Sequence, residues 1–139
     1  METAIDRTSE MSKEIVRALR KRVEHAAARR EDRLDERVSR YWIAWRSRKR
    51  NRVFAEIRPL RGRVEVFILP RPRDLRDSDG LARLAPRTQG WGWFRSRFDV
   101  RSMGQVDSAA RLIVQSYELG TRLPNGGIRK RAARRNRGL

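Results

Sequence analysis

The sequence of 139 residues contains no cysteine and a single histidine, His25. Without cysteine the chain has no disulfide, no thiolate metal site and no cysteine nucleophile. One histidine leaves no His-rich zinc site and argues against a His-dependent catalytic triad. His25 lies beside an apolar helical stripe, where a structural role is expected, so we assign it no function. We expect no metal and no cofactor.

Long apolar runs and a secretory signal are missing as well. No stretch approaches the roughly 20 apolar residues needed to cross a bilayer. The first residues, METAIDRTSEMSKE, lack the basic end and apolar block of a signal peptide. We therefore expect a cytoplasmic protein with no membrane partner. The length suits one domain with tails.

Negative charge is scarce relative to positive charge. The chain has 35 Lys and Arg against 17 Asp and Glu, a formal net charge of +18. Such an excess makes a polyanion the leading partner, through long-range attraction and counterion release. Only four of the cations are Lys. GC-rich coding DNA would favour Arg over Lys, but it would not favour cations over anions.

The pattern of residues 52–70 predicts a β-hairpin at the centre of the fold. β-branched residues alternate with others over 53–58 and again over 64–69, and the intervening Pro59-Leu60-Arg61-Gly62 suits a tight turn. Residues 38–46 and 93–101 show the alternation of two further strands. The sheet is therefore expected to have about four strands.

Two amphipathic helices are predicted to cover this sheet. Over residues 9–29 an apolar residue recurs every four positions, and Ser9 and Glu10 suit the helix N-terminus. Its basic polar face is read as solvated in preference to a docking surface. Ser102 and Gln105 match a capping box before a second helix, which Gly120 is expected to end.

These elements give an α+β domain over residues 9–120, in the order α-β-β-β-β-α. Residues 1–8 are expected to be disordered and 121–139 to form a flexible basic tail, because the tail has seven cations, no acids and little apolar material. The predicted core contains Leu19, Trp45, Ile57, Val66, Phe98 and Ile113.

Two charged segments leave alternatives open. Residues 28–37, ARREDRLDER, either continue the first helix or form a connection, with local ion pairs favoured over a metal site. In residues 71–89, Asp77, Asp79 and Gly80 are partly similar to a calcium loop, but the carboxylate spacing is incomplete. Turn chemistry is the favoured interpretation, with a helical turn expected near 81–84.

The chain also resembles the DUF5655 family of small bacterial and archaeal domains, which are sometimes labelled "predicted transport protein". The resemblance covers about residues 10–119 and involves Tyr41-Trp42-Ile43-Ala44-Trp45, Val53-Phe54-Ala55-Glu56-Ile57, the strand at 63–69, the run at 77–82, Gly90-Trp91-Gly92 and residues 113–117. Where that family often has His-Trp-Gly-x-Gly, this chain has Gly90-Trp91-Gly92-Trp93. The resemblance implies an α+β domain with no established catalytic residues, sometimes attached to nucleic-acid-processing proteins.

The leading functional hypothesis is a non-enzymatic module that binds DNA or RNA. Phosphates would be met by a basic hairpin tip, by one strand face and by the tail. The tip comprises Arg46, Arg48, Lys49, Arg50 and Arg52; the strand face comprises Trp93, Arg95, Arg97 and Arg101; the tail cations are Arg129, Lys130, Arg131, Arg134, Arg135 and Arg137. Trp93 would stack on an unpaired base, unless it packs beneath a loop while Glu56 and Glu65 pair with the strand arginines.

Two other classes remain open. A protein-interaction module would dock an acidic protein or a ribonucleoprotein assembly through the same charges. A nuclease of the PD-(D/E)xK type would need an acid followed by Glu-x-Lys on adjacent strands, and the hairpin offers Glu56-Ile57-Arg58 and Glu65-Val66-Phe67 without that lysine. The sequence thus favours binding over catalysis.

Overall fold

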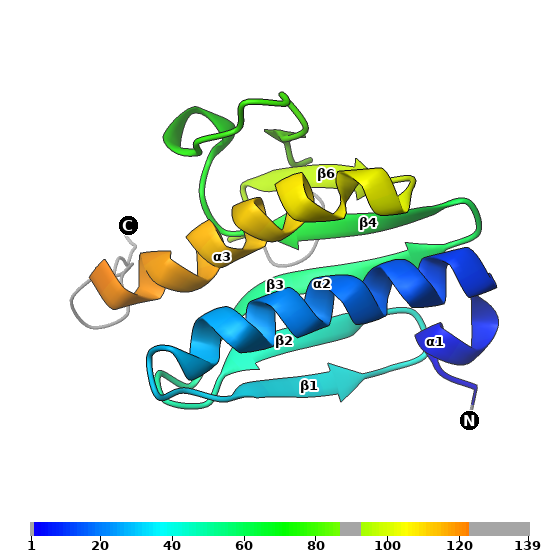
Figure 1. Ribbon diagram of the computed structural model, residues 1–139, viewed down its shortest axis with the longest axis horizontal. Coiled ribbons are helices and arrows are strands. Elements are labelled where there is room, and N and C mark those ends of the chain that lie inside the picture. Colours follow the sequence, from blue (N-terminus) through cyan, green and yellow to red (C-terminus); the bar gives the residue numbers. More distant parts are fainter. Residues whose placement is uncertain (1, 87–92, 123–139) are drawn as a thin grey trace.

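The computed structural model describes residues 2–86 and 93–122 (Figure 1). Its helices are α1 (Ala4–Arg7), α2 (Glu10–Ala28) and α3 (Val106–Arg122), with short 3-10 turns η1 (Pro72–Asp74) and η2 (Met103–Gln105). Its strands are β1 (Leu34–Val38), β2 (Ile43–Ser47), β3 (Arg52–Leu60), β4 (Arg63–Ile68), β5 (Arg83–Leu84) and β6 (Ser96–Val100). The α+β class is confirmed, with six strands in this part of the chain instead of four.

The strands form one antiparallel sheet in the order β1-β2-β3-β4-β6-β5. The hairpin β3–β4 is at its centre, as predicted, and aligns Ile57 with Val66. Its turn is tighter than predicted, because Pro59 and Leu60 belong to β3 and only Arg61 and Gly62 connect the strands. Gly62 has a φ of 80°, a left-handed conformation that glycine adopts without steric cost.

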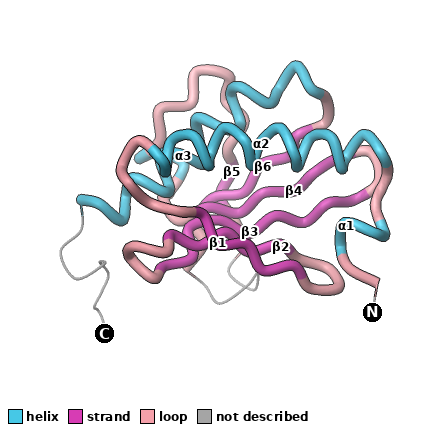
Figure 2. The backbone as a smooth tube through the Cα atoms, turned by 60° about the horizontal axis from the view of Figure 1, so that its bottom comes forward, coloured by secondary structure: helices cyan, strands magenta, loops and turns pink. Residues whose placement is uncertain are grey.

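Helices α2 and α3 lie side by side on one face of the sheet (Figures 1 and 2). Their apolar stripes and the inward-facing strand residues form one core, because each stripe needs a surface to bury. All six predicted core residues are at most 2% exposed: Leu19, Trp45, Ile57, Val66, Phe98 and Ile113. Ser9 caps α2 as predicted, since its side chain accepts from the backbone N–H of Ser12 at 3.3 Å.

Two N-terminal predictions are wrong. Residues 1–8 do not simply fray: Thr3 and Asp6 form a capping box that starts α1, and Ala4 is buried. Part of the charged segment 28–37 is a strand, because Leu34–Val38 pairs with β2 along the sheet edge. Its carboxylates pair with arginines on α2, on β2 and in the β2–β3 loop instead of with sequence neighbours.

The C-terminal half differs in detail. Ser102 makes no capping hydrogen bond, and Gln105 Oε1 instead accepts from the backbone N–H of Arg101 at 2.6 Å. Helix α3 starts at Val106 and continues through Gly120 to Arg122, so Gly120 does not end it. The expected helical turn near 81–84 is the short strand β5. Asp77 does supply turn chemistry, accepting from the N–H groups of Leu81 and Ala82.

Candidate nucleic-acid interface

The predicted hairpin tip does connect two strands, β2 and β3, but much of its charge is compensated. Asp35 on β1 accepts from Arg46 and from Arg48, each at 3.0 Å. Arg46 also donates to Asn51 Oδ1 at 2.7 Å. These hydrogen bonds hold the pKa of the Asp35 carboxyl below its usual range. The tip therefore lies against an acid that is distant in the sequence.

A second acid, Asp32, organises the same loop from beneath. Its side chain is fully buried. Oδ2 accepts from Ser47 Oγ at 2.5 Å and from the Tyr117 hydroxyl at 2.8 Å, and Oδ1 accepts from the backbone N–H groups of Arg33 and Lys49 at 2.7 and 2.9 Å. Burial opposes ionisation, but these hydrogen bonds outweigh it and lower the pKa of Asp32.

The other tip cations are also engaged. Arg50 lies 3.5 Å from Asp32 and 5.6 Å from the centre of the Tyr117 ring. Lys49 Nζ donates to the carbonyl of Arg30 at 3.3 Å. Burial lowers the pKa of the Arg52 guanidinium. Four of the five cations thus hold the β2–β3 loop against Asp32, Asp35 and the backbone at Arg30, which leaves less free charge at the tip than the sequence suggests.

The predicted strand face is partly neutralised too. Arg97 pairs with Glu65 at 3.0 Å, and Arg101 pairs with Asp99 at 3.2 Å. The expected pairing of Glu65 with a strand arginine is therefore confirmed. Among the described residues, the Glu56 side chain forms no hydrogen bond or ion pair, and burial raises its pKa. Arg95 is exposed, and Trp93 is 53% exposed.

The tail cations cannot be placed in this way. Arg129, Lys130, Arg131, Arg134, Arg135 and Arg137 lie outside the described residues.

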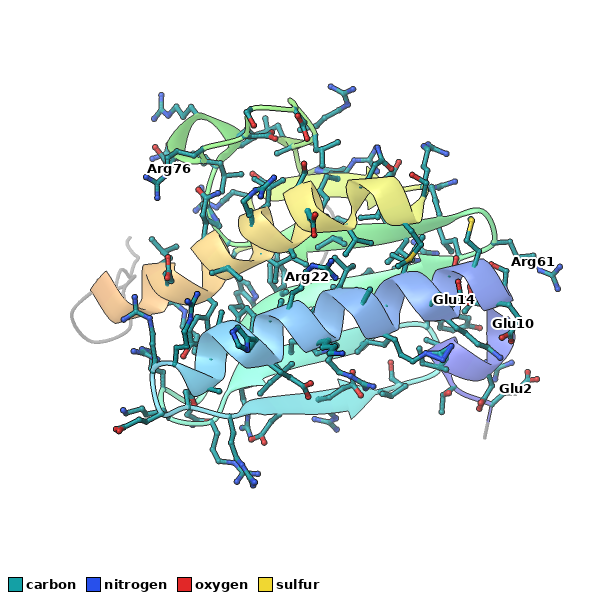
Figure 3. All side chains as sticks on the ribbon, viewed as in Figure 1. Glu2, Glu10, Glu14, Arg22, Arg61 and Arg76 are labelled. Atoms are coloured by element: carbon teal, nitrogen blue, oxygen red, sulfur yellow. The ribbon has the colours of Figure 1, made fainter. Side chains whose placement is uncertain are left out.

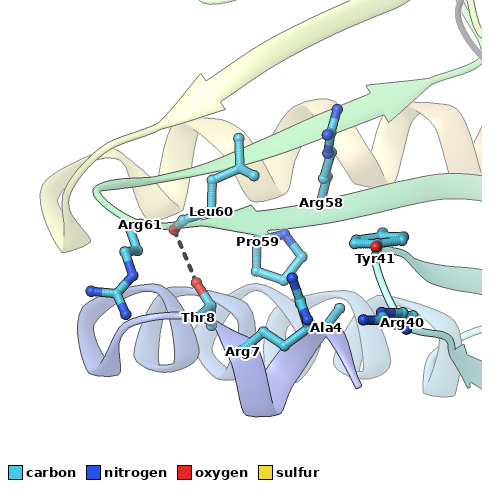
Figure 4. A pocket seen from close by; sticks show the side chains of 9 residues that line it. All are labelled: Ala4, Arg7, Thr8, Arg40, Tyr41, Arg58, Pro59, Leu60 and Arg61. Atoms are coloured by element: carbon cyan, nitrogen blue, oxygen red, sulfur yellow. Dashed lines mark hydrogen bonds between the residues drawn. The ribbon is translucent and has the colours of Figure 1, made fainter. Parts of the chain in front are cut away.

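A concentration of arginines occurs elsewhere, around a pocket of about 300 Å³ at the α1 end of β3 (Figure 4). Four arginines and no acid line it, together with one aromatic ring and a small apolar wall. The lining residues are Ala4, Arg7, Thr8, Arg40, Tyr41, Arg58, Pro59, Leu60 and Arg61. We call it the arginine pocket.

The pocket exists because β3 is longer than its neighbour. The last pair between β2 and β3 is Ile43 with Ile57, so the end of β3 has no β2 residue beside it. Pro59, which cannot donate a ladder hydrogen bond, is tolerated in such an edge segment. The chain before β2 turns away at Tyr41, which leaves a recess between this turn and β3.

Helix α1 closes one side of the recess. The N–H of Ala4 donates to the carbonyl of Ser39 at 2.8 Å, and Thr8 Oγ1 donates to the carbonyl of Leu60 at 3.0 Å. Ser12 at the start of α2 donates to the same carbonyl at 2.5 Å. A four-residue helix is not stable alone, so these tertiary contacts fix α1 and thereby place Arg7.

The pocket arginines have few acidic partners. Arg7 has an exposed partner in Glu2 at 3.6 Å. Arg58 lies 3.8 Å from Glu65, whose closer partner is Arg97 at 3.0 Å, so two guanidiniums share one carboxylate. Among residues 2–86 and 93–122, no acid pairs with Arg40 or Arg61. Figure 3 shows Arg61 extending away from the β3–β4 turn.

An exposed aromatic ring stands among these charges. Tyr41 is 50% exposed, and the guanidinium carbons of Arg7 and Arg40 lie 5.2 and 5.6 Å from its ring centre. Cations at such distances are attracted to the ring quadrupole. The pocket therefore combines long, positively charged side chains with the flat face of an aromatic ring.

Little in the sequence indicates this arrangement. Arg7, Arg40, Arg58 and Arg61 come from three separated segments, and none belongs to a run of cations as dense as the hairpin tip. The two surprises of the fold, α1 and the length of β3, bring them together. The one local indication is Pro59, because a residue without an N–H is tolerated where a strand has no neighbour to pair with.

Comparison with protein-family models, curated proteins and solved structures finds no match. The resemblance to DUF5655 therefore stays a prediction. In the described part of the chain, no group of three or more His, Asp or Glu residues is placed to hold a metal ion. None of the helices described here is long and apolar enough to span a membrane.

Proposed function

We propose that this protein is a nucleic-acid-binding module without catalytic activity of its own. The observation that carries the proposal is the arginine pocket, which four arginines line with no acid among the lining residues. Guanidinium groups match the geometry of phosphate oxygens and form paired, charge-assisted hydrogen bonds with them. The positive charges of such a cluster repel one another, and a bound anion reduces this repulsion.

The remaining charge supports a polyanion as the ligand in preference to a single small anion. The net charge of +18 is far more than one phosphate would neutralise, and six further cations lie between residues 129 and 137. Each contact between a phosphate and a cation releases counterions, so a chain of phosphates gains affinity that a single anion does not. The hairpin tip contributes less, because Asp32 and Asp35 already pair with three of its arginines.

The proposal is tested by fluorescence anisotropy with labelled DNA and RNA oligonucleotides between 50 and 300 mM salt. Binding is expected to weaken steeply and linearly on a log–log plot, with similar slopes for unrelated sequences, because phosphate contacts carry no base information. Failure to bind any oligonucleotide at the lowest salt would refute the proposal.

The alternative is an acidic-protein or ribonucleoprotein partner. A pull-down from lysate before and after nuclease treatment separates it from direct nucleic-acid binding. Loss of the captured material on digestion supports our proposal, whereas an acidic protein that persists, combined with no oligonucleotide binding, favours the alternative.

A further inference from the structure

We infer that the arginine pocket receives one unpaired nucleotide, so that the protein prefers single-stranded nucleic acid to duplex. The inference rests on the proposed function and adds the class of nucleic acid. It draws on the size of the recess, the exposed Tyr41 ring and the distribution of charge around it.

The first consideration is size. A volume of about 300 Å³ is at the small end of ligand pockets, which span roughly 300–1,000 Å³. It has room for one nucleotide but not for a duplex. A duplex keeps its bases stacked inside and offers only its backbone to the pocket mouth, so the apolar part of the lining would stay unused.

The second consideration is the apolar part itself. Ala4 and Pro59 lie together on one side of β3, and the half-exposed Tyr41 ring lies beside Pro59 (Figure 4). A purely phosphate-binding surface needs neither. Aromatic side chains beside a positively charged groove are the usual means of holding unpaired bases, because every base has a flat face to stack.

The third consideration is the position of the charges. Arg7 and Arg40 flank the Tyr41 ring, whereas Arg61 lies at the β3–β4 turn with no acidic partner among the described residues. A base on Tyr41 would therefore have cations on both sides for the phosphates that precede and follow it. Arg58 contributes less, because it lies 3.8 Å from Glu65 and its guanidinium carbon lies 5.4 Å from the centre of the Trp42 ring.

Trp93 provides a matched comparison. Its exposed fraction is similar to that of Tyr41, 53% against 50%. Trp93 is also the residue predicted from the sequence to stack on an unpaired base. It precedes β6, which is two strands away from β3 in the sheet. If the unpaired base binds in the arginine pocket, Tyr41 and not Trp93 carries the preference for single strands.

The experiment compares wild type with Tyr41→Ala, Tyr41→Phe and Trp93→Ala on a labelled 12-nucleotide single strand and on its matched duplex. We expect Tyr41→Ala to weaken single-strand binding about tenfold, within the range for loss of one base stack, and duplex binding less than twofold. Tyr41→Phe should retain single-strand affinity within about twofold, because the ring remains. Circular dichroism confirms that each variant is folded.

The possible failures are distinct. If wild type binds neither probe, nucleic-acid binding itself is refuted. If wild type binds both but Tyr41→Ala weakens them equally, or leaves both unchanged, the pocket does not select an unpaired nucleotide. A single-strand loss for Trp93→Ala without one for Tyr41→Ala would place the base at the other end of the sheet and overturn the inference.

Discussion

At the scale of single residues, the buried carboxylate of Asp32 connects several parts of the fold. It is the buried acceptor for two hydroxyls and two backbone N–H groups, which come from the end of β2, from the β2–β3 loop, from α3 and from its own neighbour. A carboxylate is suited to this position because it only accepts, and all four groups donate. One acid thus fixes the loop against both the sheet and the C-terminal helix.

We predict that Asp32→Asn lowers the free energy of unfolding by about 1–3 kcal/mol, because an amide nitrogen replaces one acceptor and faces two hydroxyls. Tyr117→Phe is the control, which removes one of these hydrogen bonds and should cost only about 1 kcal/mol. Urea denaturation measures both. Equal stability of Asp32→Asn and wild type would show that the buried contacts contribute nothing.

Asp32 also determines the direction in which the stability of the protein changes with pH. Because the pKa of Asp32 is below its ordinary value of 3.8 in the folded state, its contribution is fully present above that value. The contribution is lost as the pH falls through the folded pKa. Wild type should therefore lose its stability advantage over Asp32→Asn below about pH 4, whereas an advantage that grows on acidification would contradict the assignment.

At the scale of elements, the strongly patterned segments were predictable and the short or charged ones were not. The repeat of apolar residues in α2 and the alternation in β3 and β4 identify buried faces directly. Strand β1 could not be recognised in this way, because LDERV has only two apolar residues, both at its ends. It is also an edge of the sheet that is exposed to solvent. Edge strands commonly carry charge, which limits pairing with other chains.

Helix α1 could not be predicted from the sequence for a related reason. Four residues give no periodicity, and the helix is held by contacts with Ser39 and Leu60, which are distant in sequence. The arginine pocket inherits this difficulty, since one of its walls is α1. The predicted sites depended on local charge density, and local density could not reveal that Asp32 and Asp35 would neutralise the hairpin tip.

We predict that removing residues 1–8 lowers the free energy of unfolding by about 2 kcal/mol, because it exposes the surface under Ala4 and Ile5 and leaves the Leu60 carbonyl with fewer partners. It should also weaken oligonucleotide binding. Arg7→Gln is the matched control: exposed ion pairs contribute little to stability, so only the binding should fall. An unchanged melting temperature in the truncated protein would mean that α1 does not pack.

At the scale of the whole molecule, the charge is unevenly distributed along the chain. All 17 acids lie before residue 119, and no acid follows to balance Arg122 and the six later cations. The folded part compensates many of its own arginines, above all in the β2–β3 loop, but in the arginine pocket Arg40 and Arg61 have no acidic partner among the described residues. The pocket and the C-terminal segment are therefore the two places from which a polyanion gains most.

We predict that truncation after Arg122 leaves the melting temperature within about 2 °C of wild type, because the removed residues contain too little apolar surface to offset the entropy of ordering them. Oligonucleotide binding should weaken and its salt dependence should flatten, because six cations are lost. Differential scanning fluorimetry and anisotropy on the same samples test both. A large fall in melting temperature would show that this segment is packed.

The central claim is that the arginine pocket contacts phosphates, and the most direct measurement is the salt dependence of single-strand binding for two variants of equal charge. Arg40→Gln/Arg61→Gln removes the pocket arginines that have no acidic partner among the described residues. Arg73→Gln/Arg83→Gln removes two exposed arginines, one in η1 and one in β5, the strand at the opposite edge of the sheet from β1. Each phosphate contact contributes about 0.7 to the log–log slope for single strands. The pocket variant should therefore flatten the slope by about 1.4 and the edge variant by less than 0.5; equal flattening by both would contradict the claim.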